Sequence, residues 1–220
     1  MWPINDMKNS IHGIYALCDN SQNPALSHLE IAKRLLAGGV RVLQLRMKGE
    51  ADPNRVLATA RSILKLKEHF SFTFIMNDFV QVALELPVDG VHLGQDDMDL
   101  EMARELLGPR CLLGYSSHSM EEALAAEGRG ANYVAFGAIF PTVNKGPGHP
   151  IQGLEKLSEL VKKINVPTVA IGGIGRSNFA EVLATGVSAI AMIGALTAKP
   201  DITGEARYFV EQFESARKIP

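Results

Sequence analysis

The 220-residue sequence has only two cysteines, no long apolar run and no excess of basic residues. Cys18 and Cys111 each lie within an apolar stretch, where a thiol behaves as a small hydrophobic side chain, so we expect free thiols. The first ten residues, MWPINDMKNS, lack the basic segment and apolar core of a secretory signal. No apolar run approaches the length of a membrane span. We therefore expect a cytoplasmic protein that makes no membrane contact.

The charge balance excludes a broad nucleic-acid-binding surface. The 22 Lys and Arg residues against 24 Asp and Glu residues give a net charge of −2. Local phosphate binding is still compatible with this balance. Apolar residues make up 46% of the chain and charged residues 21%, a composition typical of a globular enzyme and unlike that of a disordered chain.

Short apolar segments alternate with helical patterns along the whole chain. The expected strands are residues 13–19, 40–49, 72–78, 88–95, 111–119, 132–142, 166–175 and 188–196. No linker divides these eight strand-helix units, so we expect one α/β domain over residues 1–220, a (β/α)8 TIM barrel. A doubly wound open sheet is the alternative, but the eightfold count and the absence of a GxGxxG turn after the first strand disfavour it.

Two local signals predict where helices begin. Asp52 is expected to cap a helix that has Pro53 at its first position. Ser119 and Glu122 have the spacing of a capping box. Active sites of such barrels lie at the C-terminal ends of the strands, so the polar residues there are the candidates for chemistry.

Gln44, Arg46 and Lys48 alternate along the second expected strand and therefore share one face, which points inward in a barrel. An inward arginine and lysine require an anion. A diphosphate suits a guanidinium beside an ammonium group. A structural ion pair with a carboxylate inside the barrel is the alternative, and spacing alone does not decide between them.

Acidic and amide side chains end the third and fourth strands, which are neighbours in a barrel. Asn77 and Asp78 end one, and Gln95 and Asp97 end the other. Two carboxylates can hold Mg²⁺ that also binds a substrate phosphate. Each aspartate alone could instead cap a helix, but beside the basic residues the pair favours a metal site. Asp96 is expected to face solvent.

The loop after the fifth strand contains Ser116 and His118. No GxSxG turn accompanies the serine, so we interpret Ser116 as a hydrogen-bond donor to substrate and not as a nucleophile. His118 could transfer a proton near neutral pH or fix the loop.

The remaining candidates follow the last three strands. Thr142, Asn144 and Lys145 lie in a Gly- and Pro-rich loop, where Lys145 could also be merely solvated. Gly172–Gly173 and Ile193–Gly194 follow strands whose loops often bind phosphate in such barrels, although glycines there can also simply form turns. The mouth therefore suits two phosphorylated substrates better than one.

Seven segments, spread in order over most of the chain, resemble the family of thiamine phosphate synthases and thiazole tautomerases. They are QLRMK (44–48), MND (76–78), GVHLGQDD (90–97), SSHS (116–119), GAIFPTVNK (137–145), AIGGI (170–174) and AMIGAL (191–196). The resemblance implies a Mg²⁺-assisted dissociative reaction. It joins 4-amino-5-hydroxymethyl-2-methylpyrimidine diphosphate to a thiazole phosphate and releases diphosphate.

The resemblance also assigns roles to residues. Asp78 and Asp97 match the metal ligands, and Asn77 lies close to the pyrimidine and its diphosphate. The matching diphosphate contacts are Gln44, Arg46, Lys48, Ser116 and Lys145, of which the last four are implied in catalysis. The thiazole phosphate side takes Thr142, Asn144, Gly173, Ile193 and Gly194.

The sequence departs from the family pattern at Asn144, Gly194 and Phe79, where a Thr, a Ser and a polar residue are usual. Two alternatives follow. One is a thiazole tautomerase that uses His118, which would not need the complete diphosphate and metal set. The other is a non-catalytic barrel that binds a phosphorylated ligand to regulate a partner. For the enzyme, the expected partners are small phosphorylated substrates, and a homo-oligomer is left open.

Overall fold

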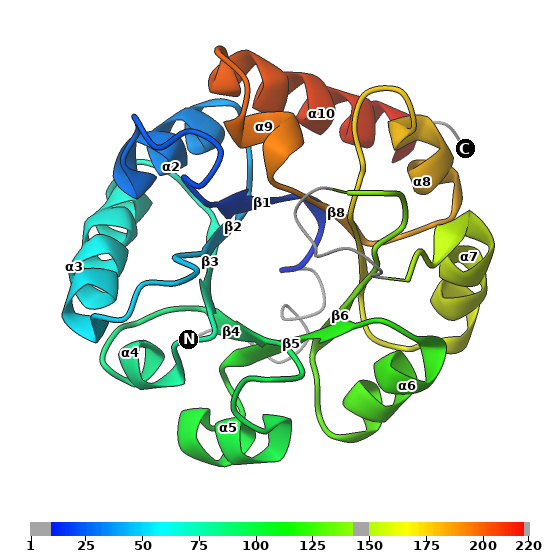
Figure 1. Cartoon of the computed structure of the whole chain (residues 1–220), viewed down its shortest axis with the longest axis horizontal. Helices are drawn as coiled ribbons and strands as arrows, with labels where there is room; N and C mark the ends of the chain where they lie inside the picture. The colour runs from blue at the N-terminus through cyan, green and yellow to red at the C-terminus, as the bar shows by residue number, and fades with distance from the viewer. Residues whose placement is uncertain (1–9, 143–149, 218–220) are drawn as a thin grey trace.

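Each strand pairs in parallel with the next one along the chain, and the last strand pairs with the first, so the sheet closes into a barrel. The structure is a computed structural model that describes residues 10–142 and 150–217. Figure 1 shows the strands around a central axis with the helices outside them. The strands are β1 (Gly13–Cys18), β2 (Val42–Leu45), β3 (Thr73–Asn77), β4 (Gly90–Leu93), β5 (Leu112–Ser117), β6 (Tyr133–Phe136), β7 (Thr168–Ile171) and β8 (Ala189–Met192).

The helices that follow the strands form the outer layer of the barrel. They are α2 (His28–Ala37), α3 (Pro53–Leu64), the 3-10 helix η1 (Lys65–Glu68), α4 (Val80–Leu84), α5 (Leu100–Leu107), α6 (Met120–Gly128), α7 (Gly153–Lys163), α8 (Phe179–Ala184), α9 (Gly194–Thr197) and α10 (Ile202–Arg217). The last helix, α10, packs against α2 and β1 and so completes the ring (Figure 1). In residues 10–142 and 150–217 no helix is both long and apolar enough to cross a membrane.

The alternation of side chains along the strands divides the core into two layers. Tyr15, Ile75, Tyr133 and their neighbours fill the inside of the barrel. A larger set, which includes Ala16 and Phe74, packs between the strands and the helices. Because most strand residues are apolar on both faces of the sheet, the strands are short apolar runs interrupted by single polar residues such as Gln44 and His92. The predicted (β/α)8 barrel is confirmed, and the open-sheet alternative is wrong because β1 pairs with β8.

Some local predictions need correction and others are confirmed. The expected strand over 188–196 ends at Met192, and the chain then turns into α9. The helix that follows β4, α5, begins at Leu100 and is capped by Asp99. Asp52 caps α3 as predicted, with its side chain accepting the N–H of Asn54. Cys18 and Cys111 are both free thiols.

Candidate active site

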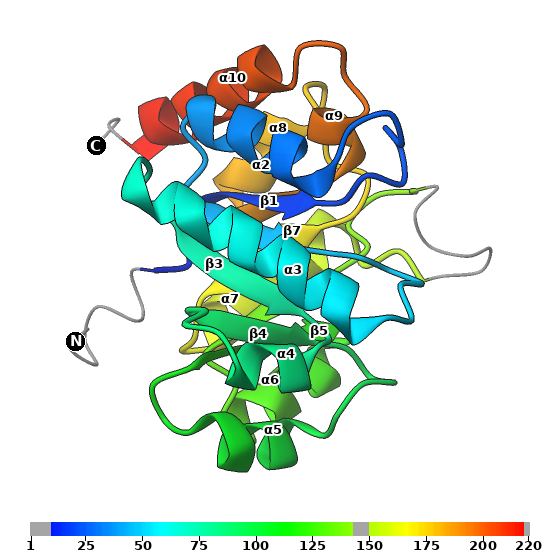
Figure 2. The ribbon, with the colours of Figure 1, turned by 90° about the vertical axis from the view of Figure 1, so that its left-hand side faces the viewer.

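A cavity of about 850 Å³ opens at the C-terminal ends of the strands. Parallel pairing aims every strand the same way, which Figure 2 shows for β1 and β5. The cavity brings together all predicted site residues that the structure describes: Gln44, Arg46, Lys48, Asn77, Asp78, Asp97, Ser116, Thr142, Gly173, Ile193 and Gly194. The other two, Asn144 and Lys145, lie outside the described residues.

Two carboxyl groups face each other across the ends of β3 and β4. Asp78 and Asp97 are close enough for a hydrogen bond between their side chains. Burial, followed by the charge of Asp97 and that hydrogen bond, raises the pKa of Asp78 to about 7. Two like charges at this distance are unfavourable unless a proton or a cation is present.

Neither of these aspartates caps a helix. The residue before α4 is Phe79, which makes no side-chain cap, and α5 is capped by Asp99. Asp97 instead accepts the backbone N–H of Gly94 at 2.6 Å within its own loop. The capping alternative is therefore wrong for both residues.

The two carboxyl groups fit Mg²⁺ better than they fit a metal whose ligands all come from protein side chains. Within residues 10–142 and 150–217, no group of three or more His, Cys, Asp or Glu side chains could hold a metal ion. Mg²⁺ commonly uses one or two protein carboxylates and completes its shell with water and substrate phosphate. The half-buried Asp78 and the exposed Asp97, beside cationic side chains in one cavity, match that requirement.

The cationic side chains lie just beyond β2. This strand ends at Leu45, so Arg46 and Lys48 belong to the following loop and not to the strand as predicted. The guanidinium of Arg46 forms an ion pair with Asp19, whose side chain is only 4% exposed. Arg46 therefore forms the structural ion pair and, because it also lines the cavity, can bind a substrate anion as well. Asp19 fixes the position of its guanidinium.

Asp19 was not predicted, although it follows the first strand in the way that Asp78 follows the third. Its burial would raise its pKa, but hydrogen bonds with Ser21 and Arg46 and the charge of Arg46 outweigh burial and lower it. The carboxylate therefore stays ionised and keeps the guanidinium in place.

Gln44 lies deeper in the cavity and is almost fully buried, with 3% of its surface exposed. Its Nε2 donates to the hydroxyl of Tyr15 at 2.9 Å. Its Oε1 is buried, and among the described residues it has no hydrogen-bond partner. A buried acceptor of this kind is costly unless a ligand supplies a donor.

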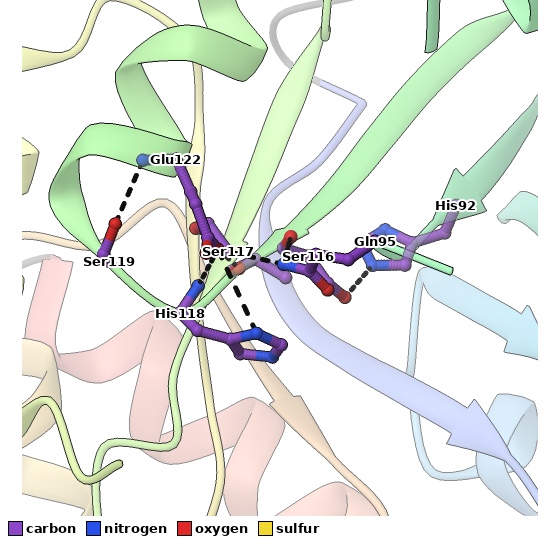
Figure 3. Close-up of polar contacts among 8 residues, drawn as sticks. His92, Gln95, Ser116, Ser117, His118, Ser119 and Glu122 are labelled. Carbon is purple, nitrogen blue, oxygen red and sulfur yellow. Dashed lines mark hydrogen bonds and ion pairs between the residues drawn. The ribbon is translucent and has the colours of Figure 1, made fainter. Parts of the chain in front are cut away.

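Ser116 is held by His92, a residue that sequence analysis did not single out. His92 Nε2 lies 2.9 Å from Ser116 Oγ (Figure 3). Burial lowers the pKa of His92 to about 4, so the ring is neutral at physiological pH. The only feature of the sequence that could have indicated a role for His92 is a polar residue within the apolar strand GVHL.

The loop after β5 is organised by Glu122 (Figure 3). Glu122 Oε2 accepts the backbone N–H of His118 at 2.7 Å and the side-chain Nε2 of Gln95 at 2.9 Å. Ser119 caps α6, but Glu122 does not return the bond to Ser119, so the predicted capping box is half formed. His118 lines the cavity with its backbone fixed by this glutamate.

The loops after β7 and β8 form the other side of the cavity. Gly172 and Gly173 both have positive φ, and a Cβ on Gly173 would lie 2.5 Å from the Pro141 carbonyl oxygen. A Cβ on Gly194 would overlap the amide of Gln22. Residues 172 and 173 therefore need to be glycine, because a Cβ would overlap the chain after β6 and because φ is positive at both.

A parallel eight-stranded barrel whose mouth gathers cations, paired carboxylates and glycine turns is typical of an enzyme that acts on phosphorylated substrates. The family described as thiamine monophosphate synthase matches residues 14–196. The chain belongs to this family, as the resemblance of its motifs predicted.

Individual relatives agree over nearly the whole chain. A thiamine-phosphate synthase of Methanocella arvoryzae is 40% identical over 89% of this chain and 92% of its own length. One from Myxococcus xanthus is 40% identical over 93% of this chain and 94% of its own. The solved structure of a thiamine phosphate pyrophosphorylase from Pyrococcus furiosus superposes with a TM-score of 0.84 and 35% identity, covering 94% of this chain and 98% of that one.

Proposed function

We propose that the protein is a thiamine phosphate synthase. It joins 4-amino-5-hydroxymethyl-2-methylpyrimidine diphosphate to a thiazole phosphate and releases diphosphate. The observation that carries this proposal is that one cavity contains Arg46, Lys48 and the facing carboxyl groups of Asp78 and Asp97. A tautomerase would require neither the cations nor the carboxylate pair.

The reaction breaks the bond between the pyrimidine methylene carbon and the diphosphate oxygen, and the electron pair leaves with diphosphate. The thiazole nitrogen then supplies the pair that forms the new carbon–nitrogen bond. The electron-rich aminopyrimidine stabilises the intermediate cation, so no side-chain nucleophile is required. The barrel contributes by holding both rings close together and excluding water.

Arg46 and Lys48 bind the diphosphate and stabilise the negative charge that grows on it as the bond breaks. Asp19 fixes the direction of the Arg46 guanidinium. Ser116 donates a hydrogen bond to the same substrate, and Lys145 is proposed as a further diphosphate contact from the resemblance. Asn77, at the end of β3, lies beside them on the cavity wall.

Gln44 has a second role beside the diphosphate contact that its motif suggested. A diphosphate offers only acceptors, whereas the orphan Oε1 of Gln44 requires a donor. The exocyclic amino group of the pyrimidine supplies such a donor. We therefore propose that Gln44 binds the pyrimidine ring at the base of the cavity, with the diphosphate above it near Arg46.

Asp78 and Asp97 would hold Mg²⁺. When bound, this ion would neutralise charge on the leaving diphosphate. The raised pKa of Asp78 makes the site sensitive to pH. On the far side of the cavity, Thr142, Gly173, Ile193 and Gly194 would take the thiazole phosphate. Asn144, which lies outside the described residues, is proposed as a further contact from the resemblance.

The test is a product assay with purified protein and both substrates. Thiamine phosphate, detected by mass spectrometry, should form with Mg²⁺ and not with EDTA. Conversion of a thiazole isomer without diphosphate release would favour the tautomerase, and tight binding of either substrate without any product would favour a regulatory barrel.

Location in the cytoplasm and assembly into a homo-oligomer stay predictions. Cell fractionation tests the first, and gel filtration with light scattering tests the second.

A further inference from the structure

Five polar side chains from five different strands form one hydrogen-bonded chain across the inside of the barrel. Gln44 Nε2 lies 2.9 Å from the Tyr15 hydroxyl, which lies 2.8 Å from the Tyr133 hydroxyl. The Tyr133 hydroxyl lies 3.1 Å from His92 Nδ1, and His92 Nε2 lies 2.9 Å from Ser116 Oγ. Figure 3 shows the end of this chain at His92 and Ser116. Both terminal residues line the cavity.

Tyr133 is the one member of this chain that is absent from the described residues lining the cavity. It is completely buried, on β6, between the tyrosine of β1 and the histidine of β4. Its place depends on Gly114 of β5, because a Cβ there would overlap the Tyr133 ring and lie 2.5 Å from His92 Nδ1. A role for Tyr133 in the reaction must therefore act through its neighbours.

Counting donors and acceptors gives the chain a direction. The amide nitrogen of Gln44 can only donate, so the Tyr15 oxygen accepts and its hydrogen passes to Tyr133. Tyr133 then donates to His92 Nδ1. The neutral ring consequently carries its hydrogen on Nε2 and donates it to Ser116 Oγ. The hydrogen of Ser116 itself is left to point toward a ligand.

The opposite direction would have the opposite consequence at both ends. Ser116 would donate its hydrogen to His92 and offer only lone pairs to a phosphorylated substrate, which is repulsive. The Oε1 atom of Gln44 would have to accept the hydroxyl hydrogen of Tyr15, and Nε2 of Gln44 would face the ligand. The observed contact of Nε2 with Tyr15 selects the first direction.

We propose that Tyr133 is a positioning residue that holds His92 in the Nε2–H tautomer and thereby makes Ser116 a hydrogen-bond donor toward the phosphorylated substrate. The consequence for Ser116 rests on the proposed function, whereas the tautomer itself does not. Cooperative polarisation along such a chain strengthens its terminal bond. A hydroxyl that never reaches the cavity would in this way influence the reaction.

The first test uses ¹⁵N chemical shifts of the histidine rings in the substrate-free protein at neutral pH, with His92 assigned by the loss of its signals in His92→Gln. The expected result is a protonated Nε2 and an unprotonated Nδ1. A ring protonated at Nδ1 in the wild-type protein would overturn the proposal, whatever any variant does. In Tyr133→Phe the two tautomers should become mixed.

The second test is a double-mutant cycle in the synthase assay. Tyr133→Phe removes the hydrogen bonds to Tyr15 and His92 and should lower kcat/KM about tenfold through the one bond that Ser116 then no longer donates reliably to the substrate. In a Ser116→Ala background the same change should cause no further loss. Equal losses in both backgrounds would show that Tyr133 does not act through Ser116. Tyr208→Phe removes a hydroxyl from the outer helix α10 and should leave kcat/KM unchanged.

The two tests separate this inference from the proposed function. If the wild-type protein forms no thiamine phosphate, the proposed function fails, but the tautomer of His92 is still measured. If product forms and His92 carries its hydrogen on Nδ1, the inference fails and the function stands. Should Tyr133→Phe not fold, the wild-type spectrum alone decides.

Discussion

The carboxyl groups of Asp78 and Asp97, which follow different strands, lie in hydrogen-bonding contact at the mouth of the barrel. Burial and the charge of Asp97 together raise the pKa of Asp78 to about 7 from its ordinary value of 3.8. Between about pH 4 and pH 7, Asp78 therefore keeps its proton in the folded chain and loses it in the unfolded chain. The pair costs folding energy that a bound cation would recover.

Asp78→Asn should raise the thermal stability of the metal-free protein at pH 8. Because the folded-state pKa is the higher one, the contribution of Asp78 to stability falls as pH rises from about 4 through 7, and the penalty is complete above 7. Asparagine removes the charge and tolerates the φ of 64° at this position. Melting in EDTA should show a gain of a few degrees.

The matched control for this change is Asp96→Asn, at the exposed aspartate in the same loop as Asp97. Its melting temperature in EDTA should equal that of the wild-type protein. A lower melting temperature for Asp78→Asn than for the wild type would mean that the two carboxylates do not repel each other.

Mg²⁺ should bind more weakly in acid. A proton on Asp78 competes with the cation, so one pH unit below the pKa of about 7 the affinity should fall about tenfold relative to pH 8. Calorimetric titration at pH 6 and pH 8 measures this directly. Binding that is equally tight at both values would place the ion elsewhere, and Asp78→Asn should abolish the dependence.

Arg46→Lys should not restore what Arg46→Ala loses. The guanidinium pairs with Asp19 on one side and faces the cavity on the other, which a single ammonium group on a flexible chain cannot reproduce. Both variants should lower kcat/KM by about two orders of magnitude or more, consistent with the loss of charge stabilisation in a transition state.

Arg129→Ala is the control for that loss, since Arg129 pairs with Asp99 and Glu101 and is absent from the described lining of the cavity. It should retain normal turnover. Steady-state kinetics with the diphosphate substrate varied tests all three variants, and a fully active Arg46→Lys would reduce the role of Arg46 to that of a simple positive charge.

Gly194→Ser should fold normally and strengthen binding on the thiazole side. The resemblance to the family gives serine at this position, and the amide of Gln22 here occupies the space that its Cβ would need. Because that amide is the end of a flexible side chain, it can move, and the stability should change by less than about 1 kcal/mol. We expect a lower KM for the thiazole phosphate with kcat unchanged; a raised KM would show that Gln22 itself contacts the substrate.

The sequence predicts those parts of the site whose residues lie close together along the chain, at the end of one strand. Gln44 to Lys48, Asn77–Asp78 and Gln95 to Asp97 each lie at the end of a strand or in the loop that follows it, and parallel closure brings all strand ends to one rim. The limits of strands were harder, because AMIGAL is apolar throughout and suits both the end of β8 and the short helix α9.

The parts that could not be predicted depend on contacts between distant strands. The hydroxyls of Tyr15 and Tyr133 are separated by 118 positions in the sequence yet lie 2.8 Å apart. A tyrosine or histidine facing inward looks, in sequence, like any other core residue of a short strand. Its partner follows only from the register of the closed barrel, and the same holds for Asp19 and Arg46.

Gly114→Ala tests whether the inside of the barrel has room for this polar chain. The added Cβ would overlap the Tyr133 ring and crowd His92, and both side chains are fixed by core packing and hydrogen bonds. Overpacking of this kind typically costs about 1–3 kcal/mol of unfolding free energy. The matched control is Gly128→Ala, in the exposed last turn of α6, where a Cβ meets nothing within 4 Å. This change should stabilise the protein by about 0.5–1 kcal/mol. Urea unfolding of both variants measures the difference, and a Gly114→Ala protein as stable as the wild type would mean that Tyr133 can move away from His92.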